Sequence, residues 1–526
     1  GTSGWIIQGT HINSYLDTSE AFAGSNSLHL VSSRTGDNSV NRIESDLSSS
    51  LSIDSTPVTI QARVRWQAGT PGILLRLHGN WLEAAGFMDI PTNLGSPGAI
   101  NSQYDVNAGP AIYDVTHLPV LPAAGQNVVV TARVADVDGL GAVSLHYRND
   151  TDAPSTNYTV PMNDNGISGD SVAGDGIYSA TIPGQGSNDL VAFYVEGTDS
   201  HGISPMTTRF PTASDGEAHV MFGQSGWGGT FGTYRFWMTE ADRVEWANRQ
   251  KLSDEPIHGT FVYGDFRAIY NAGGRFRGSP FIRSNGDPES KDTSYVFYVP
   301  KDSRVIGSTS FNLDRLEGDS TKQRERMSLW LADQIDTPFF NMRYVHLFVN
   351  QNGKNTIYSD SHSPNDDFVN AYWSDGTDGE LFKIDDWFEF NDSSQVSREF
   401  NDNAQLRLYT TTGGEKKQAR YRWSWRKEPM GGFNDDYSLF YELVDAMNYD
   451  YQSPQFAATV PAIVDYDEWM RVFAIQHIIN NWDSYGFNRG KNMSMYMPDD
   501  GQWQMIMWDL DHSHMTGSVD NNNLFS

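Results

Sequence analysis

The chain has 526 residues, more than a single hydrophobic core accommodates, which predicts two or three domains. It contains no cysteine, and this excludes disulfides, zinc–thiolate sites, iron–sulfur clusters and thiol nucleophiles. Its 66 acidic and 37 basic residues give a net charge of −29, which argues against nucleic acid and anionic membranes as partners.

Residues 1–105 are predicted to form an all-β module. Alternating apolar and polar residues with turn punctuation in "SLHLVS", "VTIQARVRW" and "GILLRLHG" indicate antiparallel strands. The pattern resembles carbohydrate-binding jelly rolls. An exposed Trp66 or Trp81 would then stack on a sugar ring, although a core position is the preferred interpretation for both. We expect a jelly roll, with glycans as candidate partners.

Residues 106–215 are predicted to form a second all-β unit. The segments "NVVVTARVADVDGLGAVSLHYR", "GDGIYSATIPG" and "LVAFYVEGTDSHG" have the strand spacing of an immunoglobulin-like sandwich. Its turns contain five aspartates that are interpreted first as turn residues and alternatively as ligands of structural Ca²⁺: Asp136, Asp138, Asp164, Asp170 and Asp175. The Gly-rich stretch 222–234 lacks the Lys-Ser/Thr of a phosphate loop, so we expect a linker there.

Residues 216–526 are predicted to form an α+β domain. "MTEADRVEWANRQKL" has Thr239 as N-cap and Asp242 three residues later, and "TKQRERMSLWLADQI" and "YDEWMRVFAIQHIINNW" are further helices. "TSYVFYVP", "RYVHLFVN", "KNMSMYMP" and "WQMIMWD" are predicted strands. The whole chain is therefore expected to be multidomain, and no run of about 20 apolar residues predicts a transmembrane segment.

The best-defined candidate site begins after the last helix. This helix is expected to end at Trp482 and to bury one face, made of Trp469, Met470, Phe473, Ile475, Ile478 and Ile479. Asp483 follows in the loop, with Asn488 five residues later, then a hairpin of strands 493–497 and 503–508, then Asp509 and Asp511. Phosphoryl transfer needs this order: an Asp for the substrate hydroxyl, an Asn for a metal, and a second Asp for the metal that bridges the phosphates.

From about residue 235 to residue 518 the chain resembles the CotH kinases, atypical kinases named for a spore-coat protein. The resemblance rests on "GGRFRGSP", "TSYVFYVPKD", "SFNLDRL", "GELFKIDDW", "NNWDSYGFNRGKNMSMY" and "MIMWDLDHSH". It implies an atypical kinase-like domain that uses ATP with Mg²⁺ or Mn²⁺. It assigns catalysis to Asp483, the metal to Asn492 or Asn488 and to Asp511 or Asp509, and nucleotide phosphates to Lys383, Lys291 and Arg277.

Two departures from the family pattern bear on activity. The family's "KKSY" appears as "KDTSY", so one lysine is missing, and "TIYSDSHS" puts His362 where relatives have an acidic residue. Part of the family's C-terminal helical region is also expected to be missing after Ser526. A non-catalytic scaffold or a nucleotide-binding pseudokinase is therefore the alternative to an active kinase.

The β modules resemble those attached to CotH domains in large secreted bacterial proteins. This predicts a secreted or cell-surface location, with a surface or matrix protein as phosphoacceptor, or alternatively a glycan-binding adhesin. His512 and His514 beside two aspartates are a minor candidate for a metallohydrolase site. One basic run is interpreted as a solvated helical face or loop, with acidic-substrate recognition as its alternative: Lys416, Lys417, Arg420, Arg422, Arg426 and Lys427.

Overall fold

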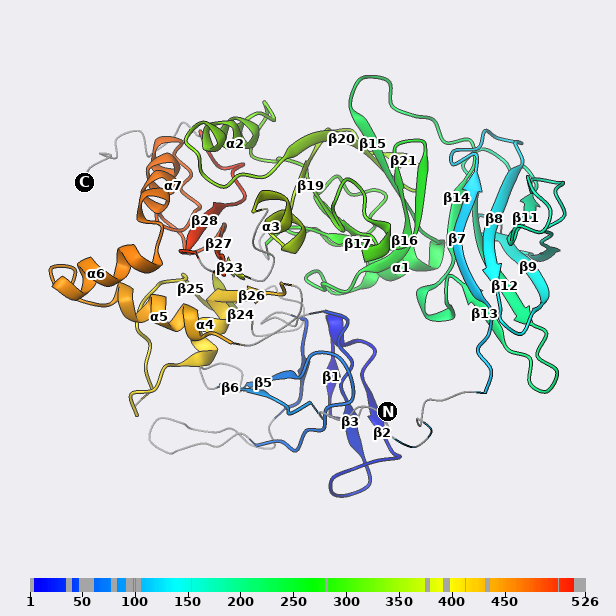
Figure 1. Ribbon diagram of the computed structural model, residues 1–526. Helices are drawn as coiled ribbons and strands as arrows, with labels where there is room; N and C mark the ends of the chain where they lie inside the picture. The colour runs from blue at the N-terminus through cyan, green and yellow to red at the C-terminus, as the bar shows by residue number, and fades with distance from the viewer. Residues whose placement is uncertain are drawn as a thin grey trace.

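The protein consists mostly of β-sheets with few helices. The computed structural model describes residues 4–34, 40–46, 61–76, 83–90, 98, 100, 106–152, 154–279, 282–373, 379–390, 398–411, 413–430, 436–499 and 501–514. Figure 1 shows a β-sandwich at one end, a β-rich body at the centre, a helical part at the other end, and the N-terminal strands beneath the last two. No helix among the described residues is long and apolar enough to cross a membrane.

The described N-terminal strands form three two-stranded ribbons, β1–β4, β2–β3 and β5–β6. Their bounds are β1 (Ile6–Ile7), β2 (Tyr15–Asp17), β3 (Ser27–His29), β4 (Ile43–Glu44), β5 (Gly72–Arg76) and β6 (Glu83–Phe87), with a 3-10 turn η1 (Gly9–His11). Residues 61–66, expected to be a strand, are irregular. Trp66 is half-buried and its Nε1 donates to the Gly69 carbonyl at 2.9 Å, whereas Trp81 lies outside the described residues. The jelly roll therefore stays a prediction.

Strands of the next unit form two antiparallel sheets around one core. One sheet has the order β11-β8-β7, and the other has β10-β9-β12-β13 with β14 also paired to β12. The bounds are β7 (Ala111–Leu118), β8 (Val128–Ala135), β9 (Leu140–Asn149), β10 (Asn157–Pro161), β11 (Ile177–Ile182), β12 (Leu190–Asp199), β13 (Thr207–Phe210), η2 (Ala213–Asp215) and β14 (Ala218–Met221). Inward residues of both sheets form one buried cluster, as in a sandwich.

The aspartates of this sandwich close turns, as their preferred interpretation predicts. Asp136 accepts the Asp138 N–H at 2.7 Å, and Asp164 accepts those of Gly174 at 2.6 Å and Gly176 at 2.9 Å. Asp170 and Asp175 accept the N–H groups two residues after them. Ligand atoms of Asp164, Asp170 and Asp175 lie within 4.8 Å of one another, and their role in Ca²⁺ binding stays a prediction.

The β-rich body is a closed barrel. Its strands run in the order β15-β16-β17-β18-β19-β22-β20, and a parallel pairing of β20 with β15 closes the circle. The short β21 pairs antiparallel with the end of β20. The bounds are β15 (Gly232–Trp237), β16 (Ile257–Tyr263), β17 (Arg267–Phe276), β18 (Tyr295–Tyr298), β19 (Ser310–Asp314), β20 (Met342–Val349), β21 (Asn352–Gly353) and β22 (Tyr358–Ser361). Alternate residues point inward and form an aromatic core that includes Phe236, Phe261 and Phe297.

Two helices and a 3-10 turn flank the barrel: α1 (Glu240–Asn248), α2 (Arg324–Gln334) and η3 (Lys301–Ser303). Thr239 caps α1 as expected, since its Oγ accepts the Asp242 N–H at 3.1 Å. The sandwich packs directly on the barrel, because His117 and Tyr270 share a buried hydrogen bond of 2.6 Å and Trp237 joins a cluster with Val120. Of the stretch 222–234 expected to be a linker, residues 222–231 form no helix or strand, whereas residues 232–234 begin β15 and Phe222 is buried in the sandwich core.

The helical part is built on a four-stranded sheet of order β26-β23-β27-β28. Its strands are β23 (Glu380–Ile384), β26 (Trp425–Glu428), β27 (Met493–Met497) and β28 (Gln504–Met507), beside a separate ribbon of β24 (Trp387–Phe390) and β25 (Arg398–Asp402). The helices are α3 (Asp366–Tyr372), α4 (Gln418–Ser424), α5 (Ser438–Met447), α6 (Pro454–Ile463) and α7 (Tyr466–Ile478). Residues of α2 belong to the same buried cluster, so α2 joins the barrel to the helical part.

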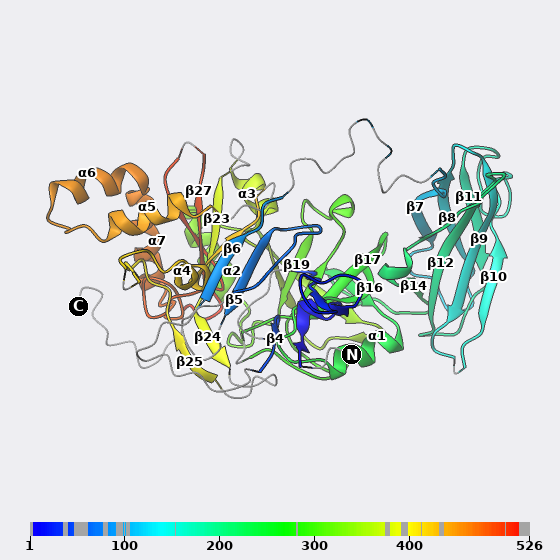
Figure 2. The same cartoon turned by 90° about the horizontal axis from the view of Figure 1, so that it is seen from below.

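The N-terminal ribbons contact both the barrel and the helical part. β6 lies against α4. Figure 1 shows the ribbons beneath the two parts, and Figure 2, seen from below, shows them in front of both. On the barrel side, Val40 and Leu252 bury one another, and the Arg34 guanidinium lies 3.6 Å from the centroid of the Tyr298 ring. Asn41 is 1% exposed, accepts the Asp254 N–H at 2.9 Å and donates to the Asp254 carboxylate at 3.3 Å.

Replacing Asn41 tests whether this docking contributes to stability. We expect Asn41→Ala to lower the free energy of unfolding by about 1–3 kcal/mol, because it leaves buried polar groups of the 252–254 loop without partners. Chemical denaturation of the full chain measures the change, with Asn157→Ala on the exposed edge of the sandwich as control. Equal effects of the two substitutions would show that the N-terminal ribbons are not docked on the barrel.

Candidate functional site

Helix α7 positions the candidate catalytic aspartate. It begins at Tyr466 after the N-cap Asp465, whose carboxylate accepts the Glu468 N–H at 3.0 Å, and it ends at Ile478, four residues earlier than expected. Its buried face includes Trp469, Val472 and Ile475, whereas Met470 and Ile478, expected in the core, are exposed. The chain then turns through Asn480, which has a φ of 54°, and Ser484 donates to the Asn481 carbonyl at 2.7 Å. Asp483 is held in this turn and is 8% exposed.

Three side chains from the following loop bind the Asp483 carboxylate. Asn492 Nδ2 donates to Oδ2 at 3.1 Å and to the Asp483 carbonyl at 2.9 Å, and Lys491 Nζ lies 3.0 Å from Oδ2. Arg489 Nε lies 3.9 Å from Oδ1. Burial lowers the pKa of Lys491, but the negative charges of Asp483, Asp386 and Asp509 outweigh it, so the net pKa shift is upward. Asp483 and Asn492, which the family resemblance assigned to catalysis and to the metal, are thus in direct contact.

The two aspartates after β28 lie within electrostatic reach of Asp483. Asp509 has a φ of 58°, and its Oδ1 lies 3.4 Å from Arg277. Asp511 is largely buried, and its Oδ1 has no hydrogen-bond partner among the described residues. Burial raises the pKa of Asp511 to about 6, with Asp509 and Asp483 adding to the rise and His512 and Arg277 opposing it. Arg277 also pairs with Asp314, so it bridges the barrel and this segment.

The segment after β23 brings a lysine and an unexpected aspartate to the same region. Lys383 Nζ lies 3.3 Å from Asp385, which also pairs with Arg426 at 2.9 Å. Asp386 is buried, and its Oδ1 has no partner in the described part of the chain. Burial is the main reason that the pKa of Asp386 rises to about 6. The charge of Lys491 opposes this rise, and the charges of Asp385 and Asp483 add to it. The paired aspartates directly after "LFKI" were the available sequence signal for this residue.

A buried glutamate on α2 also faces the aspartates and was not predicted. Glu325 accepts weak hydrogen bonds from Ser359 at 3.5 Å and Ser361 at 3.4 Å. Burial raises its pKa to about 8, and the charges of Asp509 and Asp511 add to the rise. The amphipathic pattern of α2 offers no sign that this polar residue points inward, because charged residues surround it in "KQRERM".

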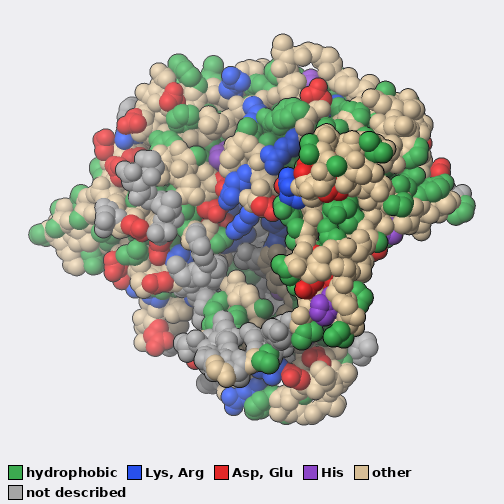
Figure 3. All heavy atoms as spheres, turned by 45° about the vertical axis from the view of Figure 1, so that its right-hand side comes forward, with side chains coloured by type: hydrophobic (Ala, Val, Ile, Leu, Met, Phe, Trp, Pro, Cys, Tyr) green, Lys and Arg blue, Asp and Glu red, His purple; other side chains and the backbone are tan. Residues whose placement is uncertain are grey.

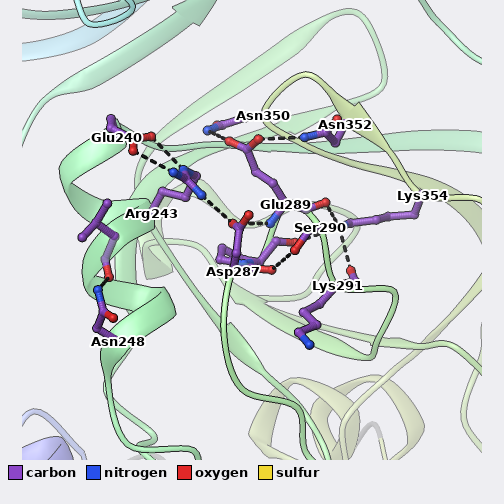
Figure 4. Close-up of polar contacts among 12 residues, drawn as sticks. Glu240, Arg243, Asn248, Asp287, Glu289, Ser290, Lys291, Asn350, Asn352 and Lys354 are labelled. Atoms are coloured by element: carbon purple, nitrogen blue, oxygen red, sulfur yellow. Dashed lines mark hydrogen bonds and ion pairs between the residues drawn. The ribbon is translucent and has the colours of Figure 1, made fainter.

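Two predicted site residues lie apart from this cluster. The Lys291 side chain is exposed, and only its backbone carbonyl is used, as an acceptor for Lys354 Nζ at 2.8 Å and the Tyr295 hydroxyl at 2.7 Å. Figure 4 shows that the ammonium group of Lys291 points away from this network, whereas the buried Lys354 points into it. Asn488 is exposed on a hollow of about 420 Å³ after Asp483 and makes no described hydrogen bond to it.

The histidines and the basic run differ from their expected roles. His512 and His514 lie in a turn rather than on one strand face, and their rings have different neighbours, Trp482 and Ser328. Members of the basic run form ion pairs within the chain instead of a solvated face: Lys416 with Asp445, Arg426 with Asp385 and Lys427 with Glu380. Trp425, within the same run, is buried in the core.

The residues in this cluster fit a divalent cation. Asp509, Asp511 and Asn492 provide the carboxylate and amide oxygens that Mg²⁺ prefers, and the buried Asp511 Oδ1 lacks a partner that a cation would supply. Among the described residues, one set of three acidic or histidine side chains brings its ligand atoms within 4.8 Å of one another. This set is Asp164, Asp170 and Asp175 of the sandwich, not the cluster around Asp483. The cluster thus offers two carboxylates and an amide rather than three carboxylates.

Glu468 of α7 gives this region a testable pH dependence. Burial raises the pKa of Glu468 to about 8 from an ordinary 4.5, against a hydrogen bond of 3.0 Å from the Met505 N–H. The folded protein therefore holds a proton that the unfolded chain releases, so this contribution to stability is lost as pH rises from 4.5 through about 8. Between pH 5 and pH 8, the free energy of unfolding of the unsubstituted chain should fall by about 2 kcal/mol more than that of Glu468→Gln, because the amide does not titrate.

Denaturation at the two pH values measures this change, with the exposed Glu442→Gln on α5 as control. A Glu468→Gln protein whose stability falls with pH as steeply as that of the unsubstituted chain would contradict the assigned protonation.

Comparison with known proteins identifies this part of the chain. Residues 275–523 match a family model described as CotH kinase protein, which includes the last barrel strands and the helical part. No curated protein matches the chain. The matched range contains Arg277, Lys383, Asp483, Asn492 and Asp511, the residues that the cluster brings together. Residues 275–523 are therefore similar to the CotH kinase family, the family that the sequence motifs resemble.

Proposed function

We propose that the domain expected at residues 216–526 is an atypical protein kinase, secreted or on the cell surface, that transfers the γ-phosphoryl group of ATP to hydroxyl side chains of a surface or matrix protein. The observation that carries this proposal is the convergence of Asp483 with Asp509 and Asp511, which come from separate elements of the fold. The family in general implies ATP and a divalent cation.

Asp483 is the residue that we assign to the phosphoacceptor hydroxyl. Its Oδ2 is occupied by Asn492 and Lys491, whereas the nearest described partner of Oδ1 is Arg489 at 3.9 Å. Oδ1 is therefore the atom that would accept the hydroxyl proton, and the contacts to Oδ2 fix its orientation. This division of roles needs no rearrangement of the turn after α7.

Asp511, Asp509 and Asn492 are the residues that would hold Mg²⁺ or Mn²⁺. Such an ion neutralises charge on the triphosphate. Arg277 lies beside Asp509, and Lys383 lies on β23, which pairs with β27. We assign both cations to phosphate oxygens. Figure 3 shows Lys and Arg side chains gathered along a hollow at the centre of one face, which would attract an anion to an otherwise acidic protein.

A nucleotide-binding pseudokinase is the second candidate. It is favoured by the position of Lys291, whose side chain lies apart from the carboxylate cluster, so one of the expected lysines is not available to the phosphates. Binding without transfer is the expected behaviour of such a protein, and it also fits a role as an assembly scaffold.

Replacement of Asp483 separates these candidates. We expect Asp483→Asn to reduce phosphoryl transfer at least 1000-fold, because an amide cannot accept the hydroxyl proton. The measurement is label transfer from [γ-³²P]ATP with Mg²⁺ or Mn²⁺ to the protein itself and to a Ser/Thr/Tyr peptide library. Asp467→Asn, exposed on the same helix, is the matched control and should keep full activity.

Transfer by Asp483→Asn at the native rate would refute its catalytic role. Absence of transfer by the unsubstituted chain, together with stabilisation by ATP and Mn²⁺ in a thermal-shift titration, would support the pseudokinase. Absence of both would leave the scaffold role.

A further inference from the structure

One mouth of the barrel contains a cavity that the proposed kinase chemistry does not use. Its volume is about 480 Å³, within the range of small-ligand pockets, which often lie in the mouths of barrels. The lining comes from the start of β15, the turn between β16 and β17, the start of β20, and α2. The parallel strands β15 and β20 close the barrel at this place, so both begin at the same mouth.

Inward-pointing polar residues form the floor of this cavity. Tyr234 belongs to the barrel core, and its hydroxyl donates to the buried Asp360 at 2.7 Å. Arg343 Nε lies 2.8 Å from the same carboxylate. Because Asp360 is satisfied by these two partners, the floor is polar but carries no excess negative charge. Figure 1 shows β15 and β20 side by side at this part of the barrel.

Aromatic rings form the rim. Phe266 is 64% exposed and packs edge-on against Tyr263 with centroids 5.3 Å apart, and Phe231 is 42% exposed and packs against Tyr344 at 5.8 Å. Large apolar rings that stay exposed beside a polar floor are characteristic of sites that stack against the apolar face of a ring.

Arg326 completes the lining with a positive charge. It follows Glu325 on α2 and is exposed, and its guanidinium lies 5.6 Å from the centroid of the Tyr344 ring. Within the described part of the chain, Arg326 makes no ion pair or hydrogen bond. The lining residues contain two arginines and no carboxylate that opens into the cavity, in a chain where acidic residues outnumber basic ones 66 to 37.

We propose that this barrel mouth binds a carboxylated ring compound of monosaccharide size, namely a uronic-acid residue of an acidic glycan. The apolar face of the sugar stacks on Phe266 or Phe231, its carboxylate pairs with Arg326, and its hydroxyls bond to the polar floor. A planar aromatic carboxylate shares the ring and the charge but lacks the hydroxyls, and is the other source of this chemistry. The site is independent of the proposed kinase activity.

Calorimetric titration of the full chain tests this site with three probes. Glucuronate is the expected ligand, glucose tests the requirement for the carboxylate, and benzoate represents the aromatic source. We expect glucuronate to bind and glucose to bind at least tenfold more weakly, because the charged hydrogen bonds to Arg326 are lost. Tighter binding of benzoate than of glucuronate would overturn the assignment to a sugar.

Two substitutions connect binding to the cavity. Arg326→Met keeps an unbranched apolar stem and removes the guanidinium, so it should weaken glucuronate binding about tenfold or more while leaving that of glucose unchanged. Phe266→Ala should weaken both sugars. Arg422→Met on α4, far from the lining, is the control. The proposal would be refuted if the chain did not bind glucuronate, or if Arg326→Met left its affinity unchanged. A thermal-denaturation curve confirms that each variant is folded.

Discussion

Mutual repulsion among closely spaced, largely buried carboxylates is the constraint around which the candidate site is arranged. The charge of Asp483 contributes to the raised pKa values of Asp386 and Asp511. The charge of Asp509 does the same for Asp511 and Glu325, and that of Asp511 for Glu325. Lys491 and Arg277 reduce this cost, since one pairs with Asp483 and the other with Asp509. Such a cluster is expensive to maintain in a resting protein, and it is the environment in which a divalent cation binds favourably.

The remaining architecture holds these charges in place from several directions. Asn41 in the N-terminal ribbons binds Asp254, and Asp254 pairs with Arg275 at 3.1 Å and with Arg283 at 2.9 Å. Arg275 lies at the end of β17, two residues before Arg277, which reaches the segment after β28. A continuous series of contacts thus leads from the N-terminal ribbons to the candidate metal ligands, so the first residues of the chain are linked to the geometry of the cluster.

Local sequence signals predicted the elements around the cluster better than the long-range contacts. Thr239 and the periodicity of α2 and α7 predicted three helices. The order of helix, loop and hairpin predicted that Asp483 would approach Asp509 or Asp511, whereas Asn492 was assigned only by the family resemblance. The exposure of Met470 and Ile478 was not predictable, because it depends on which face of α7 meets the sheet. Periodicity also extended α7 to Trp482, although the turn at Asn480 ends it earlier.

The misplaced or missed residues are those whose role depends on distant partners. Lys291 was assigned by its nearness to a family motif, but the loop before β18 presents its carbonyl rather than its ammonium group. Glu325 is buried against serines of β22, and Asp386 faces Lys491 and Asp483 about 100 residues later, contacts that no local pattern reveals. Closure of the barrel by the parallel pair β15–β20 joins segments about 110 residues apart, and this is a tertiary property that strand periodicity does not encode.

A crystal structure of the chain with Mn²⁺ and a non-hydrolysable ATP analogue tests the central claim most directly, because the anomalous signal of Mn²⁺ locates the ion without assumptions. The account predicts an anomalous peak within about 2.5 Å of oxygens of Asp511 and Asn492, with the γ-phosphate facing Asp483. A peak confined to the sandwich aspartates, or a nucleotide bound away from Asp483, would contradict it.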